Sequence, residues 1–252
     1  MVYTLEKGGK MFKIVDESNI DKEHICCSLS SKDTGVKLKK EWMKEQMKKG
    51  LVFNKLDVRG KVFIEYIPAE FAYAPITADD YLYIDCFWVS GKYKNQGYGK
   101  ELLGALIADA KDKDKSGIVV LSSNKKKPFL SDPKFLKKNG FLLADTFLDY
   151  ELLYLSFKES IIPKFNTSVG EIDGNKLYYS YQCPFTDKYV KLVKEAAESI
   201  QFPLEVICID SLEKAKEAPC PFTTYSLYLN GELITNEILT AKKFLEMIKP
   251  LQ

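Results

Sequence analysis

Arginine and histidine are almost absent from this chain of 252 residues. Lysine and arginine together number 37, yet Arg59 is the only arginine and His24 the only histidine. An anion site must therefore use lysine ammonium groups or backbone N–H groups, because forked guanidinium contacts are nearly excluded. A catalytic pair of serine or cysteine with histidine would have to rest on His24, which we expect instead on a helix surface.

Long apolar runs are also missing. The first residues lack an apolar signal segment, and the most apolar later stretch, residues 141–157, is interrupted by Asp145, Asp149 and Glu151. The formal net charge of +2 favours neither nucleic acid nor a membrane surface as a partner. We therefore expect a soluble, cytoplasmic protein that binds neither.

Paired cysteine motifs are a third absence. Six cysteines are spread too thinly for a small disulfide scaffold, and no CxxC or CxxH pair suggests zinc. The sequence therefore predicts mostly reduced thiols and no metal cofactor.

The hydrophobic pattern predicts an α/β protein with two domains. Strands are expected over 11–17, 51–58, 61–67, 81–90, 117–123, 141–147 and 150–157, and helices over 18–28, 33–49, 99–111 and 131–140. Residues 159–173 contain Pro, Gly, Ser and Asn without sustained periodicity, which predicts a linker between domains at 1–158 and 174–252. In the second domain the expected order is βαβ followed by ββα.

A glycine-bearing loop lies between a long expected strand and a helix, in FWVSGKYKNQGYGKELLGAL at residues 87–106. Here Lys94, Gly97 and Gly99 precede the first helical turn, where consecutive backbone N–H groups can surround a pyrophosphate. Glycine suits this position because a side chain would block the approach of the phosphates. A GxG pattern alone is weak evidence, since glycine also serves tight turns.

This segment resembles the signature of the GNAT superfamily of acetyl-CoA-dependent N-acetyltransferases. The family pattern is Arg/Gln-x-x-Gly-x-Gly/Ala, and Lys94 replaces the first residue, which keeps the positive charge but loses the bidentate geometry. KKNGF at 137–141 resembles the family's helix-Gly-Phe ending. The resemblance implies a mixed, splayed sheet flanked by helices, with acetyl-CoA as co-substrate. It implies cofactor contacts from Phe87, Trp88, Val89, Lys94, Asn95, Gln96, Gly97, Tyr98, Gly99 and Lys100.

Two residues of the same strand are candidates for catalysis. Many relatives carry a carboxylate on this strand and a tyrosine on the last helix of the motif region, but here Tyr83 and Leu136 stand at those positions. Asp85, two residues beyond Tyr83 and so expected on the same face, is the candidate base, with a structural hydrogen bond to loop amides as the alternative. Tyr83 is expected to orient the amine or to pack in the core. Cys86 is expected on the opposite face.

The loop between residues 68 and 81 is expected near the acceptor. Its aromatic residues Phe71 and Tyr73, with Glu70, Asp79 and Asp80, suit a cationic small-molecule or peptide amine. The alternative is an ordinary acidic surface loop.

The four letters CPFT occur twice, after Gln182 and after Pro219. Cys183 follows a strand and begins a helix, where the unpaired amides of the first turn favour thiolate. With the βαβ-ββα order, this resembles a thioredoxin-like domain in which Cys220 would face Cys183 across the site. The alternative is two separately embedded thiols. A GNAT chain with this tail resembles the YoaP-like group.

The sequence thus predicts an N-acetyltransferase that moves an acetyl group directly from acetyl-CoA to an unidentified amine. Two other functions stay open: a thiol-redox or metalloid-handling protein that uses Cys183 and Cys220, and a CoA-binding sensor without catalysis. The oligomeric state is not predicted.

Overall fold

The computed structural model describes residues 6–7, 10–25, 32–166 and 172–251. Its larger half is a mixed sheet in the order β1-β2-β3-β4-β6-β7-β9-β8. Strands β6 and β7 pair in parallel, whereas the other neighbours pair antiparallel. The strands are β1 (Glu6–Lys7), β2 (Lys10–Val15), β3 (Val52–Leu56), β4 (Val62–Pro68), β6 (Tyr81–Val89), β7 (Gly117–Ser123), β8 (Leu142–Phe147) and β9 (Tyr150–Ser156).

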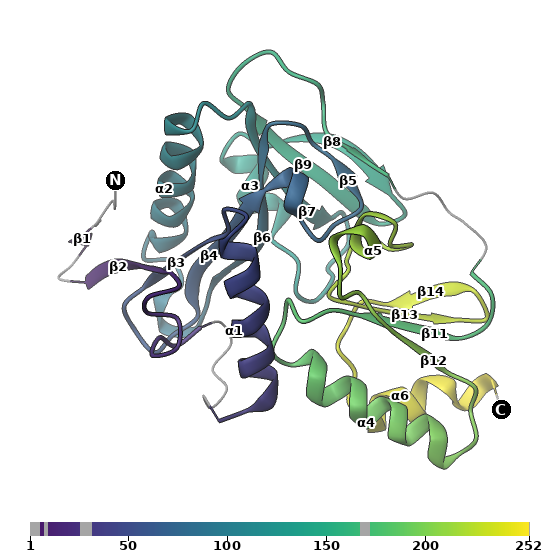
Figure 1. Cartoon of the computed structure of the whole chain (residues 1–252). Helices are drawn as coiled ribbons and strands as arrows, with labels where there is room; N and C mark the ends of the chain where they lie inside the picture. Colours follow the sequence, from purple (N-terminus) through teal and green to yellow (C-terminus); the bar gives the residue numbers. More distant parts are fainter. Residues whose placement is uncertain (1–5, 8–9, 26–31, 167–171, 252) are drawn as a thin grey trace.

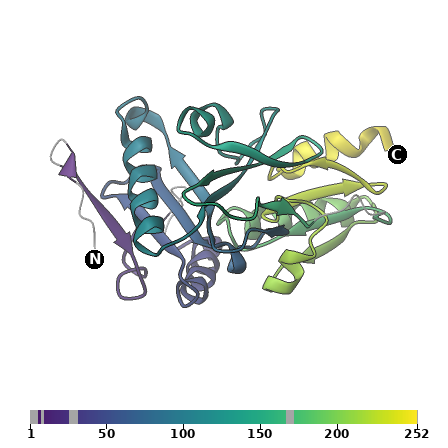
Figure 2. The ribbon, with the colours of Figure 1, turned by 90° about the horizontal axis from the view of Figure 1, so that it is seen from above.

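Helices cover both faces of this sheet (Figures 1 and 2). Helix α1 (Thr34–Met47) begins at Asp33, whose side chain accepts a hydrogen bond from the Gly35 amide, and it covers one face. Helices α2 (Tyr98–Asp112) and α3 (Pro133–Lys138) cover the other, with Asp132 capping α3. Two separate apolar cores result, because side chains alternate between the faces of a strand. The short 3-10 turns are η1 (Ala69–Phe71), η2 (Gly91–Tyr93) and η3 (Lys249–Leu251).

Strand β6 is where the sheet opens. It pairs with β7 only over Tyr81–Ile84, whereas its pairing with β4 continues to Val89. The parallel strands therefore separate after Ile84. At that point the register with β4 shifts, and Asp85 has no partner between the pairs Ile84–Tyr66 and Cys86–Glu65. One extra residue of this kind is a β-bulge, which bends a strand and redirects its side chains.

The bulge changes the alternation of β6. Before it, Tyr81 and Tyr83 pack in the core under α1; after it, Cys86 and Trp88 pack against that same core. The expectation that Cys86 points to the opposite face from Tyr83 was therefore wrong. Strict alternation holds only in a strand without an inserted residue.

The smaller half is a four-stranded sheet in the order β12-β11-β13-β14. Its first two strands are parallel and the others antiparallel, so the expected βαβ-ββα order is present. Helices α4 and α6 share a core on one face of the sheet, while α5 lies beyond its other face (Figure 1). The elements are β11 (Lys176–Tyr179), α4 (Thr186–Ser199), β12 (Glu205–Cys208), α5 (Leu212–Lys216), β13 (Tyr225–Leu229), β14 (Glu232–Thr235) and α6 (Ala241–Ile248). The thioredoxin-like name stays a prediction.

The two halves share a core. Cys220 and Tyr228 belong to the apolar cluster that also contains Tyr83 and Tyr150 of the larger sheet. The Lys216 ammonium donates to the backbone carbonyl of Ala69 at 2.9 Å. Within the segment expected to be a linker, β10 (Lys164–Phe165) pairs with β5 (Ile76–Thr77). The tail half is therefore packed against the sheet, and the expected boundaries of the domains stay predictions.

The helix expected over 18–28 does not form in its described part. Residues 17–23 make hydrogen-bonded turns, with the Ile20 amide donating to Asp16 and the Glu23 amide to Asn19. The Asp16 carboxylate accepts from the Ser18 amide and the Asn19 side-chain carbonyl accepts from the Asp16 amide, which competes with a helix. The remainder of that expected helix, with Cys26 and Cys27, lies outside the described residues. In the part of the chain that is described, no helix is both long and apolar enough to cross a membrane.

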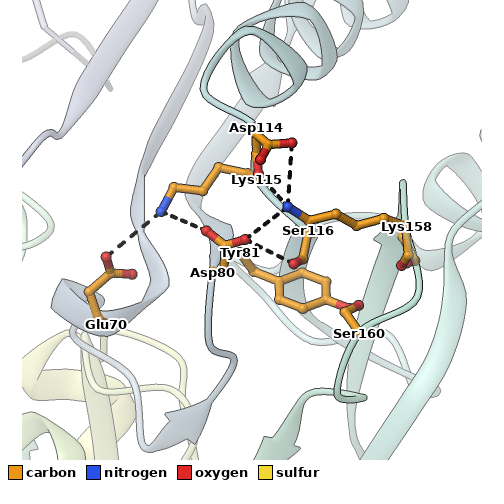
Figure 3. A network of polar contacts seen from close by, with 9 residues as sticks. Glu70, Asp80, Tyr81, Asp114, Lys115, Ser116, Lys158 and Ser160 are labelled. Carbon is orange, nitrogen blue, oxygen red and sulfur yellow. Dashed lines mark hydrogen bonds and ion pairs between the residues drawn. The ribbon is translucent and has the colours of Figure 1, made fainter.

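A polar network holds the beginning of β6 (Figure 3). Asp80 adopts a positive φ of 63° and accepts from the Ser116 hydroxyl at 2.9 Å. Lys115 and Lys158 approach its carboxylate at 3.3 and 3.4 Å. Burial opposes ionisation, but the Ser116 hydrogen bond and the two lysines hold the pKa of Asp80 below its ordinary value. This carboxylate joins β6, β7 and the chain after β9 at one end of the sheet.

Replacing Asp80 with alanine is expected to cost about 1–3 kcal/mol of unfolding free energy, because alanine loses the Ser116 hydrogen bond and tolerates a left-handed backbone poorly. Asp80→Asn, which tolerates positive φ, is expected to cost less than half as much. The stability that the Asp80 charge contributes is fully present above the pKa of aspartate in the unfolded chain. It is lost as the pH falls through the lower pKa of Asp80 in the folded chain. Urea unfolding at pH 7 and pH 3 measures both effects. Equal losses in the two variants at pH 7 would contradict the backbone argument.

Candidate active site

The loop after β6 presents a row of backbone amides. Asn95 and Gly97 have positive φ values of 60° and 87°, and Gly97 is the N-cap of α2. Gln96 does not point into the loop, because its side-chain amide donates to the Lys92 carbonyl. Within the described part of the chain, the amides of Asn95, Gln96 and Gly97 have no acceptor, whereas the Lys94 amide donates to Gly91 at 3.2 Å. Three of the expected amides are therefore available to an anion.

A cavity of about 750 Å³ lies beside this loop. Every cofactor residue predicted from the sequence lines it except Gln96. The predicted lining residues are Phe87, Trp88, Val89, Lys94, Asn95, Gly97, Tyr98, Gly99 and Lys100. The cavity thus occupies the space between the end of β6 and the N-terminus of α2.

The far wall of the cavity was not predicted. It is built by Leu130, Ser131 and Asp132 and by Phe135 of α3, with Tyr93 on the loop side. The rings of Phe135 and Phe87 meet edge to face with centroids 5.6 Å apart. A Cβ on Gly99 would lie 3.4 Å from the Phe135 ring, so glycine keeps this junction narrow. The helical pattern of residues 131–140 predicted α3 itself, but nothing local in the sequence shows that its first turn faces β6.

The cavity combines an anion-binding end with an apolar wall. Lys94 and Lys100 line it, and the N-terminus of α2 adds the positive end of a helix dipole. Phe87 and Phe135 form the apolar part. Such a site fits a long ligand with a diphosphate at one end and an uncharged chain at the other.

Asp85 lies on the side of β6 that faces α1, next to a buried ion pair. Its neighbour Glu65 pairs with Lys39 at 2.6 Å, and both side chains are 1% exposed. Burial, then the negative charge of Glu65 and a hydrogen bond with it, raises the pKa of Asp85 to about 8, although the Lys39 ammonium opposes the rise. A carboxyl whose pKa is raised toward neutrality has the property that a general base or acid requires.

Tyr83 lies on the same side of β6 and is buried. Burial, with the nearby Asp85 carboxyl, raises the pKa of its phenol well above the usual range. The hydroxyl is thus neutral at physiological pH, able to donate or accept a hydrogen bond but not to act as a base. The structure brings Tyr83 and Asp85 together, as expected. The position of the missing tyrosine is filled by Leu136, which is fully buried in the other core.

Tyr73 is enclosed between the halves instead of forming an open rim. Its hydroxyl donates to the Asp210 carbonyl at 3.3 Å, its ring meets Trp42 edge to face, and its carbonyl accepts from the Thr223 hydroxyl. These contacts give Tyr73 a packing role between the two halves. Phe71 is partly exposed and packs against the core under α1, so its expected role toward an acceptor stays a prediction.

The two CPFT cysteines pack against different apolar cores. Both are thiols in the structure. Cys220 is 1% exposed and lies 3.5 Å from the Tyr150 hydroxyl, in the core shared by the halves. Cys183 packs on the separate core under α4 and α6. Burial raises the pKa of the Cys220 thiol, although hydrogen bonds to it act in the other direction. A buried thiol of this kind is unreactive.

The chain matches two known families. Residues 21–141 match the Acetyltransferase (GNAT) family, and residues 203–246 match a family described as YoaP-like. The protein named "Uncharacterized N-acetyltransferase YoaP" from Bacillus subtilis (strain 168) is 39% identical over 245 residues, which cover 94% of this chain and 98% of that protein.

Solved structures with a similar arrangement include two acetyltransferases. The PaiA N-acetyltransferase of Thermoplasma acidophilum, in complex with coenzyme A, is 14% identical, with a TM-score of 0.41 over 58% of this chain and 99% of its own. A GNAT-family acetyltransferase of Staphylococcus aureus Mu50 is 18% identical, with a TM-score of 0.40 over the same 58% and 99%.

Proposed function

The chain belongs to the GNAT family of acetyltransferases, and from this premise we propose that it moves the acetyl group of acetyl-CoA directly to an amine while both substrates are bound. The acceptor is a small-molecule or peptide amine. The observation that carries the proposal is the cavity at the end of β6. Ten residues were expected to contact the co-substrate, and nine of them line this cavity.

Acetyl-CoA fits this cavity by its chemistry. The diphosphate would be held by the amides of Asn95 and Gly97, with Lys94 and Lys100 adding charge. The uncharged arm runs along Phe87 toward the point where β6 and β7 separate. The thioester would then lie where the two strands separate, next to the bulge that carries Asp85.

The reaction needs a neutral amine. The Asp85 carboxylate takes a proton from the ammonium or from the attacking nitrogen, the nitrogen forms a bond with the thioester carbon, and the carbon–sulfur bond breaks. The sulfur leaves as thiolate and is protonated by solvent, since Leu136 offers no acid. In this proposal Tyr83 orients the amine through its neutral hydroxyl. No acyl-enzyme is needed, and Cys220 is too deeply buried to form one.

The tail half has a packing role in this proposal. It covers the core under α1 with Cys220 and Tyr228 and holds the 69–76 loop through Lys216. The separate locations of Cys183 and Cys220 favour neither a redox nor a metalloid function.

The purified chain is expected to release coenzyme A thiol from acetyl-CoA in the presence of at least one member of a panel of small and peptide amines. The acetylated amine must appear in equal amount, as detected by mass spectrometry. Cys183→Ser is the matched control and is expected to retain activity, because that thiol lies outside the cavity. Activity lost only in this control, or thiol release without acetylated product, would refute the proposal.

A further inference from the structure

An ion pair within the protein lies directly behind the reacting strand. Lys39 comes from α1 and Glu65 from β4, and their charged atoms are 2.6 Å apart with both side chains 1% exposed. The ammonium also lies 4.2 Å from the centre of the Trp42 ring. Burying two charges costs several kcal/mol per ion, so such a pair is weak evidence for stability alone. Its position suggests a role in chemistry.

Glu65 is held against the bulge by the register of the sheet. It pairs with Cys86, the residue after Asp85, and its side chain lies within hydrogen-bonding reach of the Asp85 carboxyl. One Glu65 oxygen, Oε1, accepts from Lys39; the other, Oε2, is buried and receives no hydrogen bond from the described residues. A carboxylate supplies no donor, whereas a protonated Asp85 would supply one. The unmatched oxygen therefore points to a proton between the two carboxyls.

The balance of charge gives the same result. Two ionised carboxylates beside one ammonium leave one negative charge in a region of low dielectric, whereas one retained proton leaves none. The neighbouring groups do not change this sum: Tyr83 is a neutral phenol, Cys86 is a thiol, and β7 contributes Val119 and Leu121 to this core.

We propose that Lys39 and Glu65 are positioning residues of the transferase site. Glu65 accepts a hydrogen bond from the protonated Asp85 carboxyl, and the positive charge of Lys39 limits how firmly Asp85 holds that proton. Asp85 is thereby kept ready to change its protonation near neutral pH without a histidine. The inference rests on the proposed function, because it concerns Asp85 as the base of that reaction. Asp85 acts as a base in the molecules that have lost this proton, and the charge of the Lys39 ammonium stabilises the carboxylate that remains.

The test measures the proton of Asp85 directly, without an acceptor. In the full chain with ¹³C-labelled aspartate carboxyls, the resonance missing from Asp85→Asn identifies Asp85, and its shift is followed against pH. Glu65→Gln removes the neighbouring negative charge, so the proton affinity of Asp85 is expected to fall at least tenfold. Lys39→Met removes the opposing ammonium, so the carboxyl pair is expected to hold its protons about tenfold more tightly.

Glu151→Gln is the matched control. Glu151 is also a nearly buried carboxylate with a lysine partner, Lys137 at 2.9 Å, but it lies on β9. The Glu151→Gln variant should therefore leave the titration of Asp85 unchanged. Shifts in opposite directions for the two variants support the proposal. Shifts in the same direction, or none, overturn it, because general loosening of the core moves both alike.

The rate of acetyl transfer separates this inference from the proposed function. With any amine accepted by the chain, Glu65→Gln is expected to move the acidic limb of the pH-rate profile toward lower pH by the same amount as the carboxyl titration. If Lys39→Met does not fold, as judged by circular dichroism, Glu65→Gln decides alone. A shifted titration with an unshifted rate profile would show that the pair governs Asp85 but that Asp85 is not the base.

Discussion

Replacing Gly97 by glutamate is expected to weaken the binding of acetyl-CoA at least about 100-fold, equivalent to about 3 kcal/mol. Gly97 caps α2 with a φ of 87° and lines the cavity. A glutamate there strains a left-handed backbone and places a carboxylate among the amides that bind the diphosphate. Isothermal titration of the full chain with coenzyme A measures the loss.

Gly97→Gln is the matched control for this variant. Glutamine has the same length and the same backbone strain but no charge, so it is expected to weaken binding by roughly 10-fold, the share due to shape. Both variants should keep the circular dichroism of the tail half, because its core under α4 and α6 does not include Gly97. Unchanged affinity of Gly97→Glu would remove the cavity as the CoA site.

Asparagine at position 85 is expected to slow acetyl transfer by roughly 10²- to 10⁴-fold while the affinity for acetyl-CoA stays the same. The amide keeps the size of Asp85 but accepts no proton. Binding is spared because Asp85 is not among the residues that line the cavity. Steady-state kinetics with one fixed amine separates kcat from the KM for acetyl-CoA.

The pH dependence gives this prediction its sign. Because the pKa of Asp85 is raised to about 8, the carboxylate population and the rate increase as the pH rises toward 8, and they fall about tenfold per unit well below it. Asp85→Asn should lack this dependence, so the ratio of wild-type to variant rate retains it, while the ionisation of the amine itself cancels from the ratio. Asp109→Asn is the control. The Asp109 carboxylate accepts a hydrogen bond from the Tyr66 hydroxyl at 3.0 Å, on the α2 side of the sheet. A constant ratio from pH 6 to 9 would reject Asp85 as the base.

Much of the fold was predictable from local pattern. The strand over residues 117–123 matches β7 residue for residue, and α1 begins one residue after the expected Asp33, which proves to be its cap. These elements have strong periodicity or clear caps. The two-residue strands β5 and β10 were missed because two residues carry no period. The helix expected at residue 18 failed because its polar side chains satisfy the backbone in turns.

The site was predictable where one segment forms it and not where distant segments meet. Residues 94–100 follow one another in a strand-loop-helix motif, so their cavity was expected. Leu130 and Phe135 come from a later loop and helix, and Lys39 and Glu65 meet Asp85 only through tertiary packing. The bulge left no local mark, since Asp85 and Cys86 fit an ordinary buried strand. Register is a property of two strands, and one strand does not encode it alone.

The inserted residue at Asp85 adds a carboxyl to β6 without changing which side chains build the two walls. Ile84 lies opposite Tyr66 and Cys86 opposite Glu65, so removing Asp85 would restore simple alternation and leave Cys86 and Trp88 toward α1 and Phe87 and Val89 toward α2. A chain shorter by this one position would therefore keep the wall of the cavity and lose the titratable group behind it.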